Sequence, residues 1–172
     1  MTPSIVVTMM MTVTTGELTT VSHVDLERYQ GKWYEVARLP NRFQRDCAGA
    51  TADYALREDG RVSVLNTCYT RGGEVRTIRG SAKVVDPSNA RLRVRFDGLF
   101  FKLFSWLIKA NYWILELDPE YRYAVVGTPD RKYLWILSRG PEMDEPLYRE
   151  LLDRSEAHGF EVERILRTRV PP

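Results

Sequence analysis

The sequence predicts an all-β fold: an eight-stranded antiparallel up-and-down β-barrel with one C-terminal helix packed on its outside. Between Trp33 and Ser138, apolar and polar residues alternate mostly with a period of two, which is typical of strands. Turn sequences such as Asp59-Gly60 divide this region into short segments, and no helical segment separates them. The period becomes helical only near Asp144.

Eight consecutive segments are expected to form the strands. They cover residues 33–38, 50–56, 61–69, 75–85, 91–96, 112–117, 122–127 and 132–138. The alternation is clearest over 91–96, where three arginines alternate with Leu92, Val94 and Phe96. Neighbouring segments usually pair, and closing the sheet removes its exposed edges, so a barrel is the expected arrangement.

The segment after Asp144 is expected to be a helix, capped by Asp144 and ended by Gly159 in the left-handed conformation. Its large apolar residues share one face: Leu147, Tyr148, Leu151 and Leu152. A single apolar stripe needs a single partner surface, so the helix is expected on the outside of the barrel. A short last strand over 162–166 is expected to follow it.

Composition indicates one globular domain over residues 23–170. The chain has 172 residues, 44% of them hydrophobic and 28% charged, with a net charge of +2. This composition excludes a largely disordered chain, and the charge is too small for a nucleic-acid partner. Two histidines and two cysteines leave little material for a metal site. No metal and no cofactor are therefore expected.

Residues 1–22 differ from the rest of the chain. They hold four of the five methionines, and Glu17 is their only acidic residue. Two interpretations stay open: a flexible tail, or a degenerate export signal that lacks the usual basic residues at its start. An export signal would send the protein to the periplasm or the outer membrane, whereas a tail would leave it in the cytoplasm.

Three segments carry a resemblance to a known family. Gly31–Arg38 contains a G-x-W motif, Leu117–Tyr123 contains an Asp-x-x-Tyr turn, and Trp135–Arg139 ends in an arginine. In this order, on eight strands, they resemble the lipocalins, and within that family most of all the bacterial lipocalins and apolipoprotein D. The second motif departs from the family because Leu117 replaces a threonine, and because Tyr121 and Tyr123 compete for the tyrosine position.

The resemblance implies a binding protein and not an enzyme. It implies that Gly31, Trp33 and Arg139 are structural, with Arg139 lying across Trp33 to close one end of the barrel. The residues agree with a non-enzymatic function, since no Ser-His-Asp arrangement, phosphate loop or metal-ligand spacing occurs. The implied ligands are fatty acids, lysophospholipids or similar amphiphiles.

Strand parity predicts which side chains point into the barrel and contact the ligand. These are Ala52, Tyr54, Val64, Asn66, Ile78, Ala82, Phe96, Trp113, Leu115, Tyr133 and Trp135. The small residues Ala52, Gly80 and Ala82 favour a cavity, although a barrel of eight strands can also be plugged by its own side chains. Glu35 also faces inward, where it meets either a ligand head or, more simply, an internal hydrogen bond near the closed end.

Loop 98–111 is unusually apolar for a loop at the mouth of the barrel. Its large apolar residues include Phe100, Phe101, Phe104, Trp106 and Leu107, and its only charges are two lysines. Three interpretations stay open: a lid, a segment that enters a membrane surface, or a contact in a homodimer. Four mouth arginines either receive a ligand's acidic head or are plain surface charge: Arg42, Arg45, Arg71 and Arg131.

The two cysteines favour a disulfide. An ideal Asp59-Gly60 turn pairs residues whose numbers sum to about 119, which places Cys68 opposite Thr51 and leaves Cys47 four residues away. A bridge therefore requires the chain to bulge after Cys47, and the alternative is two reduced thiols. A disulfide would imply an oxidising compartment.

Two functional hypotheses follow. The first is a carrier or buffer of amphipathic ligands that loads at a membrane through loop 98–111. The alternative is a protein-interaction module that dimerises through the same loop and has a plugged barrel.

Overall fold

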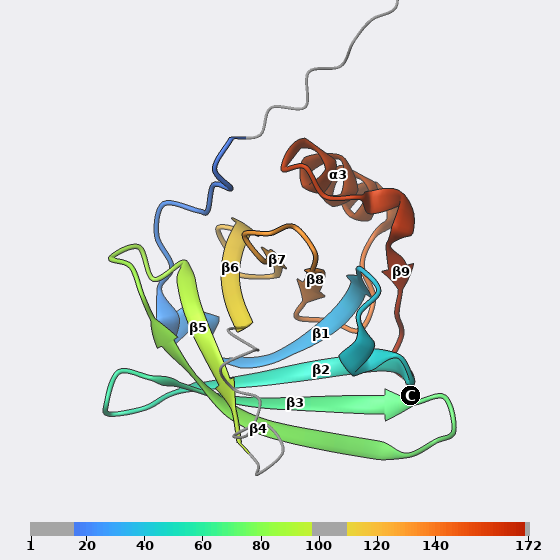
Figure 1. Ribbon diagram of the computed structural model, residues 1–172, viewed down its shortest axis with the longest axis horizontal. Coiled ribbons are helices and arrows are strands. Elements are labelled where there is room, and N and C mark those ends of the chain that lie inside the picture. Colours follow the sequence, from blue (N-terminus) through green and yellow to red (C-terminus); the bar gives the residue numbers. More distant parts are fainter. Residues whose placement is uncertain (1–15, 98–109, 171–172) are drawn as a thin grey trace, which may run out of the picture.

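The computed structural model describes residues 16–97 and 110–170, and it confirms the predicted barrel. The strands are β1 (Gly31–Arg38), β2 (Cys47–Leu56), β3 (Val62–Thr70), β4 (Val75–Val84), β5 (Arg91–Phe96), β6 (Ala110–Leu117), β7 (Tyr123–Gly127) and β8 (Leu134–Ser138). Each pairs antiparallel with the next, and β1 closes the sheet by pairing with both β8 and β2 (Figure 1).

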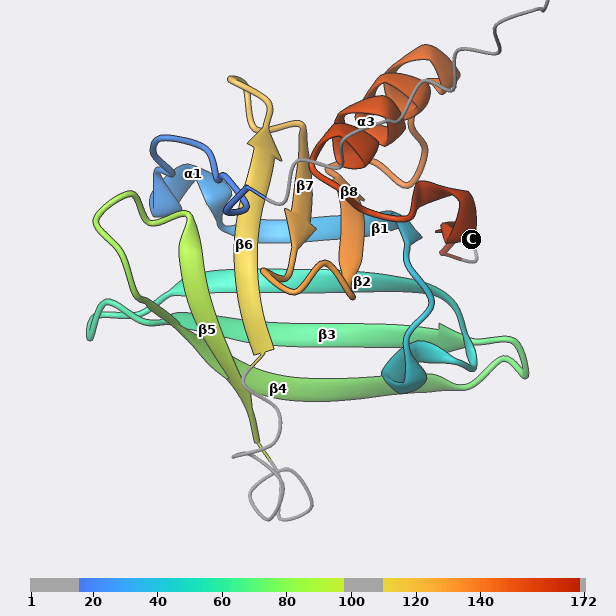
Figure 2. The ribbon, with the colours of Figure 1, turned by 45° about the horizontal axis from the view of Figure 1, so that its top comes forward.

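The apolar side chains divide into an inner and an outer cluster. The inner cluster fills the barrel and includes Trp33, Val64, Leu92 and Ile114. The outer cluster joins residues of β1, β6, β7 and β8 to α3 (Glu145–Ala157), whose Leu151 is fully buried there. Figure 2 shows α3 outside the barrel, beside β7 and β8, as predicted.

The helix begins where the sequence predicts, but without the expected cap. The Asp144 side chain makes no capping hydrogen bond, and Pro146 lies in the first turn. The helix ends at Ala157, and Gly159 follows with a φ of 87°. The expected last strand over 162–166 is wrong for most of its length. Val162–Arg164 form a 3-10 turn (η2), and β9 contains only Leu166–Arg167, paired with β1.

Two further short helices lie before strands of the barrel. Helix α1 (Leu26–Tyr29) precedes β1 and is capped by Asp25, whose carboxylate accepts from two backbone N–H groups. A 3-10 turn, η1 (Arg42–Gln44), lies between β1 and β2. Before α1, Leu18 is buried in the outer cluster, and the Val21 N–H donates to the Ile114 carbonyl. Residues 16–22 therefore pack on the barrel, although a flexible tail over 1–22 was one expectation.

Bulges in three strands change which side chains face inward. They lie between Cys47 and Gly49 in β2, between Glu35 and Ala37 in β1, and between Ile114 and Glu116 in β6. A bulge places two residues of one strand opposite one residue of its partner, so the alternation of faces shifts beyond it. The bulge in β2 brings Cys47 towards Cys68, and the bulge in β1 turns Arg38 to the same face as Glu35.

Candidate ligand-binding interior

One end of the barrel is closed by Trp33 and Arg139. The Trp33 side chain is fully buried, and its Nε1–H donates to the Tyr29 carbonyl at 2.9 Å. The Arg139 guanidinium lies over the Trp33 ring, 3.9 Å from its centroid. This is the arrangement that the family resemblance implies, and a cation–π contact of this kind contributes roughly 0.5–2 kcal/mol.

Arg139 also ties three chain segments together at the closed end. Its guanidinium donates to the carbonyls of Arg28, Lys32 and Tyr121 at 2.8–3.2 Å. Gly31 lies directly beneath it with a φ of 91°, and a Cβ at this position would fall 3.3 Å from Arg139 Nη1. A glycine is therefore required for both the backbone conformation and the approach of the arginine.

Of the two tyrosines of the second motif, Tyr121 is the one that forms a hydrogen bond to the segment before α1. Its hydroxyl accepts from the Asp25 backbone N–H at 2.9 Å, whereas Tyr123 lies in the outer cluster under α3. Asp118 accepts from the backbone N–H and the guanidinium of Arg122, and these hydrogen bonds hold the pKa of Asp118 below its usual range. The Tyr121 hydrogen bond thus holds the turn before β7 against the segment that leads into α1.

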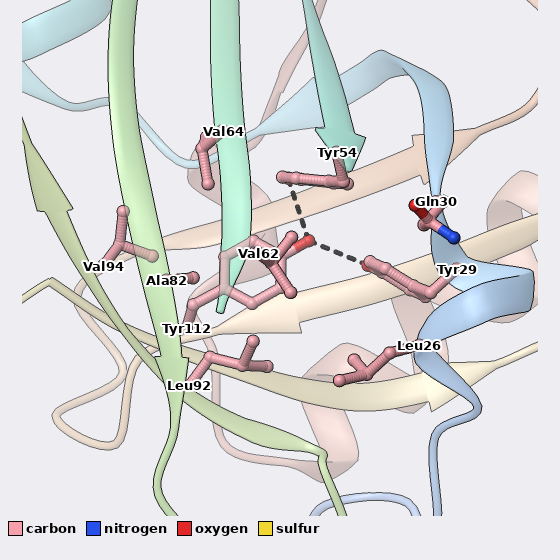
Figure 3. Close-up of a pocket in the computed structure, with 10 residues that line it drawn as sticks. All are labelled: Leu26, Tyr29, Gln30, Tyr54, Val62, Val64, Ala82, Leu92, Val94 and Tyr112. Carbon is pink, nitrogen blue, oxygen red and sulfur yellow. Dashed lines mark hydrogen bonds between the residues drawn. The ribbon is translucent and has the colours of Figure 1, made fainter. Parts of the chain in front are cut away.

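Three tyrosine hydroxyls meet inside the barrel, next to the closed end (Figure 3). Tyr29 comes from α1, Tyr54 from β2 and Tyr112 from β6. The Tyr112 hydroxyl lies 2.8 Å from that of Tyr29 and accepts from that of Tyr54 at 3.1 Å. Burial raises the pKa of Tyr54 to about 12, and burial also raises the pKa of Tyr29 and of Tyr112 well above 10. The cluster is therefore neutral at physiological pH.

A small cavity remains beside these hydroxyls. Its volume is about 20 Å³, which is room for about one water molecule. The lining is apolar apart from the tyrosines and one amide: Leu26, Tyr29, Gln30, Tyr54, Val62, Val64, Ala82, Leu92, Val94 and Tyr112. The barrel is thus nearly filled at this depth.

Towards the other end of the barrel, the inward-facing residues become more exposed. Along β3, Val62 and Val64 are buried, whereas Asn66 is half-buried. Along β4, Ala82 is buried and Ile78, opposite Asn66, is half-buried. Along the middle of β3 and β4, exposure of the inward-facing residues therefore increases away from the closed end.

Most of the predicted ligand contacts lie on the inner face. Tyr54, Val64 and Ala82 line the small cavity, and Ala52, Phe96 and Trp135 pack against the inner cluster. Gly80 does not create space, because a Cβ there would fall 2.5 Å from the Arg95 carbonyl oxygen. Tyr133 stacks on Trp135, with ring centroids 6.1 Å apart.

The prediction for β6 was wrong. Trp113 and Leu115 lie in the outer cluster, and Tyr112 and Ile114 face inward instead. All four residues from Tyr112 to Leu115 are large and apolar or aromatic, so alternation alone does not distinguish the two faces. The pairing of Tyr112 with Leu92 sets the parity, and Arg91 covers Trp113 from outside, 4.4 Å from its ring centroid.

Sequence reasoning also missed Tyr29 as an interior residue. Tyr29 precedes the first strand and reaches the barrel only because α1 turns it inward. The available signal was its position four residues before Trp33, within a segment that Asp25 caps.

A buried polar network lies at the mouth end of β1. The Glu35 carboxylate pairs with the Arg38 guanidinium, and both side chains are almost fully buried. Gln44 donates to Glu35 at 2.6 Å and accepts from the indole N–H of Trp135 at 3.0 Å. The Glu35 carboxylate therefore has hydrogen-bond partners within the protein, as expected. These partners lie at the mouth end of β1, whereas the expected position was near the closed end.

The disulfide is present between Cys47 and Cys68, with their Cα atoms 5.4 Å apart. The expected register was wrong by one residue, because Cys68 lies opposite Ala50 and not Thr51. The bulge after Cys47 then brings this residue to Cys68. Arg38 donates to the Cys47 carbonyl at 2.8 Å, so the disulfide and the polar network adjoin.

Of the four expected mouth arginines, Arg131 forms its hydrogen bonds away from the mouth. Its guanidinium donates to the carbonyls of Gly16 and His158, on the outside of the barrel near the end of α3.

The expected membrane or dimer residues Phe100, Phe101, Phe104, Trp106 and Leu107 lie outside the described residues. Within the part of the chain that is described, no group of three metal-ligating side chains occurs, and no helix is long and apolar enough to cross a membrane.

A closed antiparallel barrel with one sealed end and an apolar interior is typical of proteins that bind small hydrophobic ligands. A family model described as a lipocalin-like domain matches residues 24–170. The chain therefore belongs to the lipocalin family, whose members are binding proteins and not enzymes.

Known proteins of this family align over most of the chain. It is 37% identical to temperature-induced lipocalin-1 of Arabidopsis thaliana, over 88% of this chain and 82% of that protein. It is 39% identical to the outer membrane lipoprotein Blc of Citrobacter freundii (90% and 84%) and 31% identical to apolipoprotein D of Mus musculus (84% and 76%). The structure of insecticyanin from Manduca sexta has the same fold, with a TM-score of 0.67 at 18% identity over 91% of this chain and 86% of that one.

Proposed function

We propose that this lipocalin carries or buffers fatty acids, lysophospholipids or similar amphiphiles in its barrel. The observation that carries this proposal is the gradient of exposure along the middle of β3 and β4, from buried Val64 and Ala82 to half-buried Asn66 and Ile78. An acyl chain placed along this gradient gains about 0.8 kcal/mol for each methylene that leaves water. Its polar head remains at the mouth.

We further propose that the protein works in an oxidising compartment in association with the outer membrane. The Cys47–Cys68 disulfide supports this location, since such bonds persist mainly outside the cytosol. The similarity to Blc, named an outer membrane lipoprotein, supports it independently.

A basic surface on β4 and β5 supports loading at a membrane. The outward side chains of Arg79, Lys83, Arg93 and Arg95 are exposed, and none of them forms an ion pair among the described residues. Lys83 lies directly opposite Arg93, and like charges in this position destabilise a strand pair. Anionic lipid headgroups would relieve this repulsion. Loop 98–111, which joins β5 to β6, would add its apolar side chains.

Tryptophan fluorescence tests ligand binding. Titration with lysophosphatidylcholine below its critical micelle concentration should give a saturable change, because Trp135 lies on the inner face. The Trp135→Phe variant should lose most of this change. The matched Trp113→Phe variant, altered in the outer cluster, should keep it. No saturable change in the folded wild-type protein would refute the carrier proposal.

Vesicle flotation tests membrane loading. The wild-type protein should float with vesicles that contain phosphatidylglycerol, and less with pure phosphatidylcholine vesicles. Arg93→Glu/Arg95→Glu should weaken binding to the anionic vesicles, and Phe101→Ser/Trp106→Ser should weaken binding to both. As a control, Arg149→Glu changes an exposed arginine of α3, and it should weaken vesicle binding only slightly, through the change in net charge. Equal losses for Arg149→Glu and for the β5 double variant would contradict a specific surface.

The nearly filled closed end supports a second candidate, an interaction module with a plugged barrel. Such a protein would dimerise through loop 98–111 and bind no lipid. Sedimentation equilibrium distinguishes the two. A concentration-dependent dimer that Phe101→Ser/Trp106→Ser abolishes, together with no lysophosphatidylcholine binding, would select this candidate.

A further inference from the structure

The three tyrosines inside the barrel have one hydroxyl proton more than their hydrogen bonds use. Tyr29, Tyr54 and Tyr112 supply three O–H donors, and two hydrogen bonds join them. If Tyr29 donates to Tyr112, the Tyr112 proton is unused, and if Tyr112 donates to Tyr29, the Tyr29 proton is unused. In either case, one buried donor has no acceptor among the described residues.

The neighbouring groups do not supply that acceptor. Gln30, the other polar residue of the cavity, uses its carbonyl oxygen to accept from the Leu56 N–H at 2.7 Å. Its amide donates to the Glu27 carbonyl. The remaining lining consists of aliphatic side chains such as Leu92 and Val94. A buried hydroxyl without an acceptor is costly, so the spare proton points to a group that fills the adjoining water-sized space.

The lining also determines the charge of that group. No Lys or Arg side chain lines the cavity. An ionised carboxylate or phosphate at this depth would lack a counter-ion and would lose its hydration, at a large cost. A neutral oxygen, such as the carbonyl oxygen of a ketone or an aldehyde, needs only the one donor that is available. An oxygen of this kind occupies about the space of one water molecule.

We propose that the three-tyrosine cluster is a subsite for a neutral acceptor oxygen at the deep end of the ligand. The inference rests on the proposed function, because it requires that the barrel takes up an amphiphile. It goes further by naming the chemistry of the buried end: of two such amphiphiles, the one whose apolar tail carries a neutral carbonyl or hydroxyl oxygen at that end binds more tightly than the one whose tail ends in hydrocarbon.

A matched pair of ligands tests the subsite. 2-Undecanone and 2-methyl-1-undecene differ only in that a C=CH2 group replaces the C=O group. Their dissociation constants are measured by tryptophan fluorescence, and the ratio of the two constants is compared between protein variants. Because the ratio is compared between variants, the different hydration of the two free ligands cancels.

The choice of variants follows from the count of protons. Any single Tyr→Phe change in the cluster still leaves at least one unused hydroxyl proton, so it should retain preference for the ketone. Tyr29→Phe/Tyr54→Phe/Tyr112→Phe removes every hydroxyl and preserves the ring shapes. This triple variant should reduce the preference for the ketone by about three- to tenfold, the range expected for one net hydrogen bond. Tyr123→Phe, in the outer cluster, is the matched control and should leave the ratio unchanged.

Infrared spectroscopy provides a measurement that does not depend on folding of the triple variant. The carbonyl stretch of 13C-labelled 2-undecanone bound to the wild-type protein should lie below its frequency in hexane, as for a hydrogen-bonded carbonyl. An unshifted stretch, or an equal ratio in the wild type and the folded triple variant, would overturn the subsite while both ligands still bind. If neither ligand nor lysophosphatidylcholine binds the folded wild type, the carrier function fails as well.

Discussion

Removal of the Arg139 side chain should destabilise the barrel more than any change to an exposed arginine. Arg139→Ala removes the cation above Trp33 and three hydrogen bonds to carbonyls of α1, β1 and the turn before β7. The cation–π contact contributes about 0.5–2 kcal/mol. The hydrogen bonds contribute about 0.5–1 kcal/mol each, because these carbonyls lie at partly exposed residues where water can replace the guanidinium. Since these contributions are not independent, we expect a total loss of about 2–4 kcal/mol.

Urea unfolding monitored by circular dichroism measures this loss, provided that the m-value is unchanged. Arg139→Lys keeps the positive charge but not the planar fork that reaches three carbonyls, so it should recover less than half of the lost stability. Arg149→Ala is the control, because among the described residues Arg149 forms only an exposed pair with Glu145, worth about 0–1 kcal/mol. A loss for Arg139→Ala no greater than for Arg149→Ala would refute the reasoning.

Three further predictions concern the disulfide, the interior tyrosines and Asp118. Cys47→Ser/Cys68→Ser should lower the free energy of unfolding by about 3 kcal/mol, because the bond closes a loop with a sequence separation of 21; an unchanged urea midpoint would contradict this. The stability that the neutral interior tyrosines contribute is fully present below their ordinary pKa near 10 and should be lost as the pH rises through the folded value of about 12 for Tyr54. Ultraviolet titration should therefore show these tyrosines ionising only together with unfolding, and ionisation in the folded state near pH 10 would contradict their burial. For Asp118, whose pKa is lowered by Arg122, the contribution is present above the ordinary pKa near 3.8 and lost as the pH falls through the lower folded value. The stability difference between wild type and Asp118→Asn should accordingly shrink on acidification, and a constant difference would exclude this linkage.

Sequence periodicity predicted the parts of the fold in which one face of a strand is plainly polar. Strand β5 has the predicted bounds, because its arginines and its apolar residues alternate without exception. The motif residues Trp33 and Arg139 lie as the family resemblance implies, since their positions depend on the closure of the barrel and not on any one loop.

The predictions that failed depend on the length of a turn and on a strand with two apolar faces. In β6, both alternating sets are large and apolar or aromatic, so only the pairing with β5 decides that Tyr112 faces inward. Between β2 and β3, the Arg57 N–H donates to the Arg61 carbonyl, so the loop is longer than an ideal Asp59-Gly60 turn and Cys68 lies opposite Ala50 and not Thr51. Neither pairing register nor a bulge leaves a signal in the hydrophobic pattern of a single strand, and both arise from contacts between segments.

The bulge in β1 shows how such a defect can produce a functional end of the barrel. In a regular strand, Glu35 and Arg38 are three residues apart and would point to opposite faces. The bulge between Glu35 and Ala37 turns both to the inside, where they pair and where Arg38 also holds the Gln44 and Cys47 carbonyls. This pair and the disulfide fix the mouth, as Arg139 fixes the closed end. Between these two ends, the interior is packed by apolar side chains around the three-tyrosine cluster, so the proposed acyl ligand would displace apolar contacts while the polar groups of both ends stay paired.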